Sequence, residues 1–291
     1  MTSPALHGSL AAIAALPEPD LKTIFTTEPD RMSALVLNQG PLRFDWSKTH
    51  LTADLIDAFL NLAQEQGFAA QRDALFAGEA VNNTEGRAAE HPAERGEGNA
   101  ESVARAKALH ERMRALIDAI EAGALGEIRH ILHIGIGGSA LGPDLIIDAL
   151  DGDGIRYDVA IVSNVDGTAL ERAMDSFDPA YTLIAVASKT FTTTETMLNA
   201  ASAINWMVEA GVEDPYGRVI ALTASPDKAI EWGVDETRIL PFQESVGGRY
   251  SIWSSIGFPI AMAVGMDDFR AMLAGAKAVD EHFRDTDGAA N

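Results

Sequence analysis

The feature that most constrains the fold is a glycine-rich turn between two apolar segments. Residues 131–136 form an apolar run long enough for a buried strand, and residues 144–150 repeat apolar side chains at helical spacing. Gly135, Gly137 and Gly138 therefore occupy a strand-to-helix turn. Glycine lets backbone N–H groups approach a ligand closely, and the following helix begins with unpaired donors and the positive end of its dipole. The pattern predicts a unit that favours a bound phosphate.

Two nucleotide-binding motifs fit this turn less well. The spacing Gly135-x-Gly137-x-x-Ala140 is close to the dinucleotide fingerprint, which also needs an acidic residue at the end of the next strand. The next strand candidate, residues 157–162, has Asp158 near its beginning instead. No Gly-Lys-Ser/Thr follows the glycines, so the Walker A pattern is absent. A nicotinamide cofactor and a simple chain reversal remain the alternatives to a phosphate site.

After residue 128 the chain alternates short apolar segments with helical ones. The strand candidates are apolar and β-branched without polar alternation, which is typical of parallel strands buried on both faces. Right-handed crossovers would place helices on both sides. We predict an α/β fold with a doubly wound five-stranded parallel sheet flanked by helices, preceded by an N-terminal helical region. The strand candidates are 129–134, 157–162, 181–186, 218–223 and 237–240, and the helices between them are 140–150, 167–176, 193–210 and 226–232.

The N-terminal region has a mainly helical pattern. Thr52 is a possible N-cap for one helix, which Gly67 ends. A second helix is expected over about residues 69–78, and a longer one over about residues 100–122. Between these two helices, residues 90–99 are charged and contain glycines, so we expect an exposed loop there.

The composition limits the classes of partner. The net charge of −21 argues against broad binding to nucleic acid or to an anionic membrane. The chain has no cysteine, which excludes disulfides and thiolate metal sites, and its seven histidines show no metal-ligand spacing. Neither a signal-peptide pattern nor a membrane-spanning apolar run is visible. We expect a cytoplasmic protein without nucleic-acid or membrane partners, in which a phosphate site depends on local donors.

A cluster of hydroxyl groups follows the third strand candidate. Residues 187–195 read Ala-Ser-Lys-Thr-Phe-Thr-Thr-Thr-Glu and place five hydroxyls and one ammonium before a helix. Hydroxyls orient toward phosphate oxygens, and Lys189 supplies charge. The alternative is an ordinary helix start, with a threonine N-cap and Glu195 favourable to the helix dipole. Because one or two hydroxyls would suffice for a cap, an anion site is the better interpretation.

A third motif places an arginine after two glycines. Residues 245–251 read Ser-Val-Gly-Gly-Arg-Tyr-Ser and follow the last strand candidate. Two glycines allow a sharp turn that brings Arg249 inward, where an always-charged guanidinium stabilises a developing oxyanion. The alternative is a surface arginine that pairs with Glu244, a contact worth little.

Taken together and in this order, the three motifs resemble the phosphoglucose isomerase family, which has the sugar-isomerase fold. The resemblance covers roughly residues 80–285, and its motifs are highly specific in combination. The matching segments are residues 83–87, 135–143, 163–168, 188–196 and 247–254.

This resemblance implies reversible aldose–ketose isomerisation of glucose 6-phosphate and fructose 6-phosphate, in glycolysis and gluconeogenesis, through a cis-enediol(ate). Arg249 would stabilise the enediolate, and Gly138 and Ser139 would contact the sugar. The family needs no cofactor or metal, and its members are homodimers in which a neighbouring subunit completes the site. By position, the residues implied to bind the phosphate are Ser188, Lys189, Thr190, Thr192 and Thr193.

One departure from the family concerns the catalytic base. Family members continue with a second sugar-isomerase domain, which carries the glutamate base, a histidine for ring opening and a C-terminal lysine. No counterpart follows Arg249, because Glu281 and His282 lie on a helix that matches other family positions. We therefore expect the first portion of the enzyme, with its base beyond residue 291. The expected divisions are a mainly helical region at 1–125, the first sugar-isomerase, phosphosugar-binding domain at 126–265, and at 266–291 a helix leading to a second domain that is absent.

Other functions stay open at this stage. A non-catalytic phosphosugar-binding regulatory module would also lack a base, and a nicotinamide-dependent oxidoreductase comes third. If a base does lie within the chain, Glu85 is the candidate, with an ion pair to Arg87 as the alternative. His133 and His110 are interpreted as core histidines.

Overall fold

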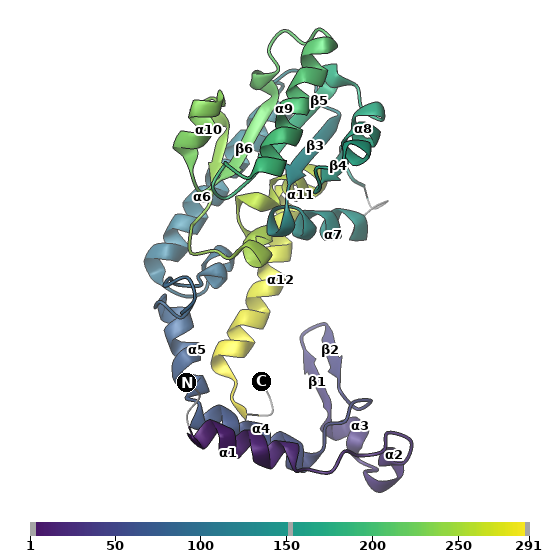
Figure 1. Cartoon of the computed structure of the whole chain (residues 1–291), viewed down its shortest axis with the longest axis vertical. Coiled ribbons are helices and arrows are strands. Elements are labelled where there is room, and N and C mark those ends of the chain that lie inside the picture. The colour runs from purple at the N-terminus through teal and green to yellow at the C-terminus, as the bar shows by residue number, and fades with distance from the viewer. Residues whose placement is uncertain (1–3, 151–153, 289–291) are drawn as a thin grey trace.

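The computed structural model of the chain describes residues 4–150 and 154–288. A fully parallel sheet of five strands lies in the upper part of the molecule in Figure 1. Its strands are β3 (His130–Gly135), β4 (Asp158–Val162), β5 (Thr182–Ala187), β6 (Val219–Thr223) and β7 (Ile239–Pro241). They lie in the order β4-β3-β5-β6-β7. This confirms the predicted five-stranded parallel sheet, and each strand begins and ends within two residues of its candidate.

Helices cover both faces of this sheet. They are α6 (Ala100–Glu121), α7 (Leu141–Ala149), α8 (Gly167–Asp175), α9 (Thr194–Glu209), α10 (Pro226–Trp232), α11 (Phe258–Val264) and α12 (Met266–Asp285). Ile131, Leu183 and Ile220 pack on one face with α6, α7, α11 and α12. Leu132 and Ile184 pack on the other face with α8, α9 and α10. The doubly wound arrangement is therefore confirmed, and strand side chains alternate between two apolar layers.

The strand order creates a reversal at β3. The chain leaves β3 for β4 on one side and then crosses to β5 on the other. Ligands of open parallel sheets bind outside the carboxyl ends of the strands at such a reversal. Gly135 ends β3 directly beside Ala187, which ends β5. The glycine turn and the hydroxyl cluster therefore leave the sheet at adjacent points.

The N-terminal elements lie away from the sheet, beside and beyond the end of α12 (Figure 1). They are α1 (Pro4–Ala14), α2 (Ile24–Thr27), α3 (Arg31–Ala34), the antiparallel hairpin β1 (Val36–Gln39) and β2 (Leu42–Asp45), α4 (Ala53–Glu65) and α5 (Phe68–Ala77). Thr52 caps α4 as predicted, since its Oγ1 accepts the N–H of Leu55 at 3.2 Å. Across the described residues, no helix is both long and apolar enough to cross a membrane.

The expectation of an exposed loop at residues 90–99 is wrong. His91–Arg95 form a 3₁₀ turn, η1, most of which is buried. Arg95 binds Asp280 of α12 through two contacts of 2.5 and 2.7 Å. Glu97, also buried, contacts two cations of the same helix. These charged side chains can be buried because each pairs with an opposite charge on α12. That helix is distant in the sequence, so a local pattern does not reveal the pairing.

A buried arginine holds the N-terminal elements together. Arg31 donates from Nε to Ser47 O at 2.5 Å, from Nη1 to Leu51 O at 2.6 Å and from Nη2 to Thr49 O at 2.5 Å. Its Nη1 also contacts Glu28 Oε2 at 2.7 Å. The five donors of a guanidinium suit this set of acceptors. One side chain therefore fixes the segment between β2 and α4.

Replacement of Arg31 by alanine is expected to lower the free energy of unfolding by about 3 kcal/mol, because each largely buried carbonyl that loses its donor costs about 1–3 kcal/mol. Urea denaturation followed by circular dichroism measures the loss. Arg43→Ala is the control: Arg43 is mostly exposed and its partner Asp45 lies 4.0 Å away, so its effect should stay within about 0.5 kcal/mol. Equal losses in the two variants would contradict the role given to Arg31.

Candidate functional site

The glycine turn lies directly at the carboxyl end of β3. Gly137–Ser139 form the 3₁₀ turn η2, and Gly137 has a φ of +58°, the left-handed conformation that glycine adopts most easily. Gly135 must also be small, since a Cβ there would lie 2.8 Å from Ser139 O. The turn therefore folds back onto its own strand, and α7 begins at Leu141 immediately after it.

The backbone of Gly138 touches the backbone of the third motif. A Cβ on Gly138 would lie 2.0 Å from Gly248 O, so the approach requires glycine at this position. Gly248–Trp253 form the 3₁₀ turn η6, which contains Arg249. Ser251 Oγ lies 3.1 Å from Gly138 O and 2.7 Å from Gly248 O, within donating distance of both. The glycine turn and the arginine motif are therefore in direct contact.

His133 supports the same turn from within the sheet. Its side chain is fully buried, and Nε2 lies 2.6 Å from Ser139 O. Because a carbonyl only accepts, Nε2 carries the proton. Nδ1 is buried and has no hydrogen-bond partner in the described part of the chain. Burial lowers the pKa of His133 to about 4, so the ring is neutral at pH 7, in agreement with the expected core histidine.

The hydroxyl cluster is anchored to the neighbouring strand β6. Ser188 N donates to Leu222 O at 3.0 Å. Lys189 O accepts from Ala224 N at 3.0 Å and from Thr223 Oγ1 at 3.1 Å. These bonds fix the path of the backbone on both sides of the Lys189 side chain.

Phe191 turns this loop back on itself. Its φ is +53°, which is costly for a bulky residue. Its side chain is buried and lies edge-on to Trp232, with ring centroids 5.9 Å apart. Burial of the ring offsets the backbone strain and lets the polar residues on either side stay near the sheet edge.

Four hydroxyl groups of the loop lie in two pairs. Ser188 Oγ is 3.0 Å from Thr193 Oγ1, and Thr192 Oγ1 donates to Thr190 Oγ1 at 2.9 Å. Thr193 occupies the N-cap position of α9, yet its side chain makes no capping bond. An ordinary helix start therefore does not explain the cluster. The start of α9 brings N–H donors to the same place as the hydroxyls.

The two predicted cations differ in their contacts. Lys189 is half-buried and donates from Nζ to Glu244 O at 2.9 Å. Arg249 is exposed and has no ion-pair partner within residues 4–150 and 154–288. The alternative of a surface pair between Arg249 and Glu244 is therefore not observed. An exposed, uncompensated guanidinium stands beside the glycine turn.

Glu85 is bound to a cation rather than free to act as a base. Arg87 Nε donates to Glu85 Oε2 at 2.6 Å. That hydrogen bond is the main reason that the pKa of Glu85 lies below its usual range, and the charge of Lys189 lowers it further. A lowered pKa makes a carboxylate a weaker base. The ion-pair interpretation is therefore favoured.

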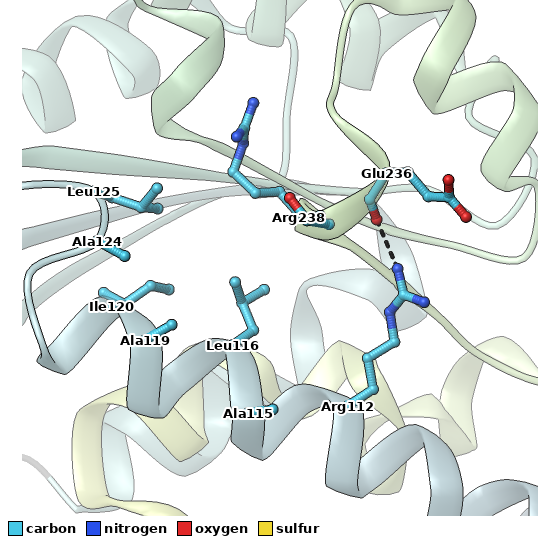
Figure 2. Close-up of a pocket in the computed structure, with 10 residues that line it drawn as sticks. Arg112, Ala115, Leu116, Ala119, Ile120, Ala124, Leu125, Glu236 and Arg238 are labelled. Carbon is cyan, nitrogen blue, oxygen red and sulfur yellow. Dashed lines mark hydrogen bonds between the residues drawn. The ribbon is translucent and has the colours of Figure 1, made fainter.

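A cavity of about 600 Å³ lies elsewhere, between α6 and the 3₁₀ turn η5 (Glu236–Arg238). Figure 2 shows Leu116 and Ile120 of α6 on one wall, and Arg112, which donates to Glu236 O at 2.6 Å, beside them. The turn η5 precedes β7, so the cavity sits at the amino ends of the strands. No predicted site residue is among those that line it.

The predicted site residues lie together at the carboxyl edge of the sheet, although their roles as ligands stay predictions. Sequence reasoning missed Thr223 and Ser225, whose hydroxyls lie 3.1 and 3.4 Å from Lys189 O. Their place directly after a strand was the available signal. In the two described stretches, no three acidic or histidine side chains are arranged to hold a metal ion. The predicted site residues at the carboxyl edge of the sheet are Gly138, Ser139, Ser188, Lys189, Thr190, Thr192, Thr193 and Arg249.

The two glycines in contact should respond differently to an added methyl group. Gly138→Ala is expected to lower the free energy of unfolding by about 2 kcal/mol or more, because the Cβ would collide with backbone that has no rotamer to change. Gly248→Ala is the matched control: the nearest atom to a Cβ there is Gly138 Cα at 4.0 Å. Denaturant unfolding compares the free energies of unfolding of the two variants. Equal losses would contradict the conclusion that only Gly138 lacks room for a Cβ.

Burial of His133 predicts a loss of stability in acid. Its folded pKa of about 4 lies below the unfolded value of about 6.5, so the unfolded state binds more protons in between. The free energy of unfolding should fall as the pH drops from about 6.5 to about 4, by up to about 1.4 kcal/mol per pH unit for this residue. His133→Gln retains a donor that does not titrate, so its profile should be flatter. Identical profiles would refute this assignment.

Comparison with known proteins bears on the family of the chain. The family model described as phosphoglucose isomerase matches residues 45–291. A curated glucose-6-phosphate isomerase of Rhizorhabdus wittichii is 66% identical over 273 residues, which cover 94% of this chain and 55% of that protein. The one of Zymomonas mobilis is 59% identical over 279 residues, covering 96% and 55%. The chain spans about half the length of the curated relatives it matches.

A solved structure supports the fold. The crystal structure of a glucose-6-phosphate isomerase from Chlamydia trachomatis matches with a TM-score of 0.82 at 24% identity, over 95% of this chain and 56% of that one. At this identity the likeness bears on the fold alone. The family model, in contrast, covers most of the sequence. The chain therefore belongs to the phosphoglucose isomerase family.

Proposed function

We propose that this chain supplies the phosphosugar site and the oxyanion-stabilising arginine of an enzyme that interconverts glucose 6-phosphate and fructose 6-phosphate. The contact between Gly138 and Gly248 carries the proposal, because it joins the glycine turn to the turn of Arg249. Two relatives named glucose-6-phosphate isomerase are 66% and 59% identical to this sequence. Since the chain spans about half of them, the activity is proposed for the protein translated to its natural stop codon.

The loop of residues 188–193 is proposed to hold the phosphate. Its paired hydroxyls lie at the start of α9, which supplies N–H donors, and the same loop carries the ammonium of Lys189. Hydroxyls and oriented N–H groups donate to phosphate oxygens, and a cation strengthens those bonds. Such local donors are needed in a chain whose net charge is −21. The Lys189 ammonium, now on Glu244 O, would turn to the ligand.

Arg249 is proposed to act at the reacting end of the opened sugar. A base removes the proton from C2 of the aldose, the bonding electrons form a C1–C2 double bond, and charge develops on O1. A proton then returns to C1, and the hydroxyl proton on O2 moves to O1. Arg249 is always charged and is free of ion-pair partners among the described residues, so it suits that oxyanion. Gly138 and Ser139 would contact the sugar between the two ends.

The base is proposed to lie in the part of the longer relatives that this chain does not span. Glu85 is bound to Arg87 and its pKa is lowered. Glu195 is exposed in the first turn of α9, so it is not held in a partly desolvated position. A general base works best with a pKa near the operating pH. The lowered pKa of Glu85 moves away from that requirement.

The remaining proposals concern organisation. We propose the division into an N-terminal region at 1–125, a phosphosugar-binding domain at 126–265 and a connecting segment at 266–291 that begins with α12. We also propose that the longer protein works as a cytoplasmic homodimer, as expected for the family. The absence of cysteine fits a reducing compartment.

Isomerisation of fructose 6-phosphate tests the function in two proteins: residues 1–291, and the protein translated to its natural stop codon. The longer protein should be active and the shorter one inactive, because the base lies outside these residues. In the longer protein, Arg249→Lys should lower kcat by about 10²-fold through weaker oxyanion stabilisation. Lys189→Met should raise KM by about tenfold or more through loss of a charged donor.

Two results would contradict parts of this account. Activity in residues 1–291 would place the base within them and return attention to Glu85 and Glu195. No activity in either protein, with fructose 6-phosphate still bound in calorimetry, would refute the enzyme and favour a non-catalytic phosphosugar-binding module.

A further inference from the structure

Arg249 belongs to a turn that is held at both ends. The first residue of η6, Gly248, contacts Gly138 of η2. The last residue, Trp253, contacts side chains of α6 and η1. The carbonyl oxygen of Trp253 lies 2.9 Å from Nε2 of His110 on α6. The indole ring lies against the guanidinium of Arg95, whose Cζ is 5.0 Å from the ring centroid. The second end of the turn therefore depends on η1 and α6.

Arg95 is itself immobilised by an acidic partner. Its Nε lies 2.5 Å from Asp280 Oδ2 and its Nη2 lies 2.7 Å from Asp280 Oδ1, a bidentate pair. The two side chains are 6% and 14% exposed. Bidentate pairing fixes the plane of a guanidinium, and a planar cation packs well on an aromatic face. A continuous set of contacts therefore runs from α12 through Arg95 to Trp253.

A second buried pair acts on the same tryptophan. Glu94 Oε2, whose side chain is 1% exposed, lies 3.2 Å from Nε2 of His110. The carbonyl of Trp253 only accepts, so Nε2 of His110 bears the proton and donates it to that oxygen. Glu94 Oε2 lies close to the ring but has no hydrogen-bond partner among the described residues. Arg95 of η1 thus holds Trp253 through its ring, and His110 of α6 holds it through its main chain.

We propose that Arg95 is a positioning residue for Arg249: with Asp280 it holds Trp253, and so sets where η6 presents the Arg249 guanidinium. The inference rests on the proposed function and concerns a residue that touches no substrate. Arg249 acts on charge that develops during the reaction, whereas the loop of residues 188–193 supplies ground-state affinity. A loosened turn should therefore lower kcat more than it raises KM. A misplacement of about 1 Å can cost on the order of 10²-fold in rate.

Arg72, on α5, offers a matched control because it also contacts residues at the end of α12. Its side chain is also buried, 8% exposed, and its Nη2 lies 2.8 Å from Asp287 Oδ1, just beyond the end of α12. This pair joins α5 to the end of α12 and does not reach η6. Arg72→Lys should therefore disturb packing to an extent comparable with Arg95→Lys, without moving Arg249.

The test measures isomerisation of fructose 6-phosphate by the protein translated to its natural stop codon. Arg95→Lys keeps the charge but loses the bidentate, planar contact, and should lower kcat by about tenfold or more with KM within about twofold. Arg72→Lys should leave both parameters within about twofold of the wild type. Thermal unfolding of each variant checks that the two losses of stability are similar.

A pair of variants at Trp253 gives an independent readout. Trp253→Phe keeps an aromatic face for Arg95 and should retain most of kcat, whereas Trp253→Leu removes that face and should lower kcat as Arg95→Lys does. If Arg95→Lys does not fold, the two Trp253 variants decide. A kcat that is retained in Trp253→Phe and lowered in Trp253→Leu supports the proposal, and equal kcat values in the two variants overturn it.

The outcomes separate the inference from the function beneath it. An unchanged kcat in Arg95→Lys, or equal losses in Arg95→Lys and Arg72→Lys, would overturn the positioning role while isomerisation stands. An inactive wild-type protein, or an Arg249→Lys variant with normal kcat, would overturn the proposed function and the positioning role with it.

Discussion

The close approach of Gly138 to Gly248 is the contact on which the candidate site depends. Backbone meets backbone there, so a larger residue at Gly138 has no rotamer that relieves the collision. The strand order adds a second constraint, because β3 and β5 end side by side and bring the loop of residues 188–193 to the same edge. An anion and a reacting centre can then share one edge of the sheet.

Charge in this protein is arranged locally rather than as one field. The net charge is −21, yet an exposed Arg249 and a half-buried Lys189 stand at the candidate site. Around η1, acidic side chains instead form ion pairs with buried cations, as Asp280 does with Arg95. Buried pairs of this kind add fixed geometry more than stability, since their desolvation cost offsets their attraction. Their value here is the fixed position of the turn that carries Arg249.

The sequence was enough to predict the elements of the sheet domain, because buried parallel strands and their helices have strong periodic patterns. It also predicted which polar residues share the carboxyl edge, since parallel strands all end there. It could not predict that residues 90–99 are largely buried, because their partners, such as Asp280, lie on a distant helix. The left-handed backbone of Phe191 was equally hidden, since local preference opposes it and only burial against Trp232 offsets the cost.

A crystal structure of this chain with fructose 6-phosphate bound would test the central claim most directly. The account predicts the phosphate against the hydroxyls of Ser188, Thr190, Thr192 and Thr193, and the sugar extending past Gly138 toward Arg249. A phosphate at the amino edge of the sheet, for example in the cavity between α6 and η5, would contradict it. So would a sugar bound with its reacting carbons away from η6.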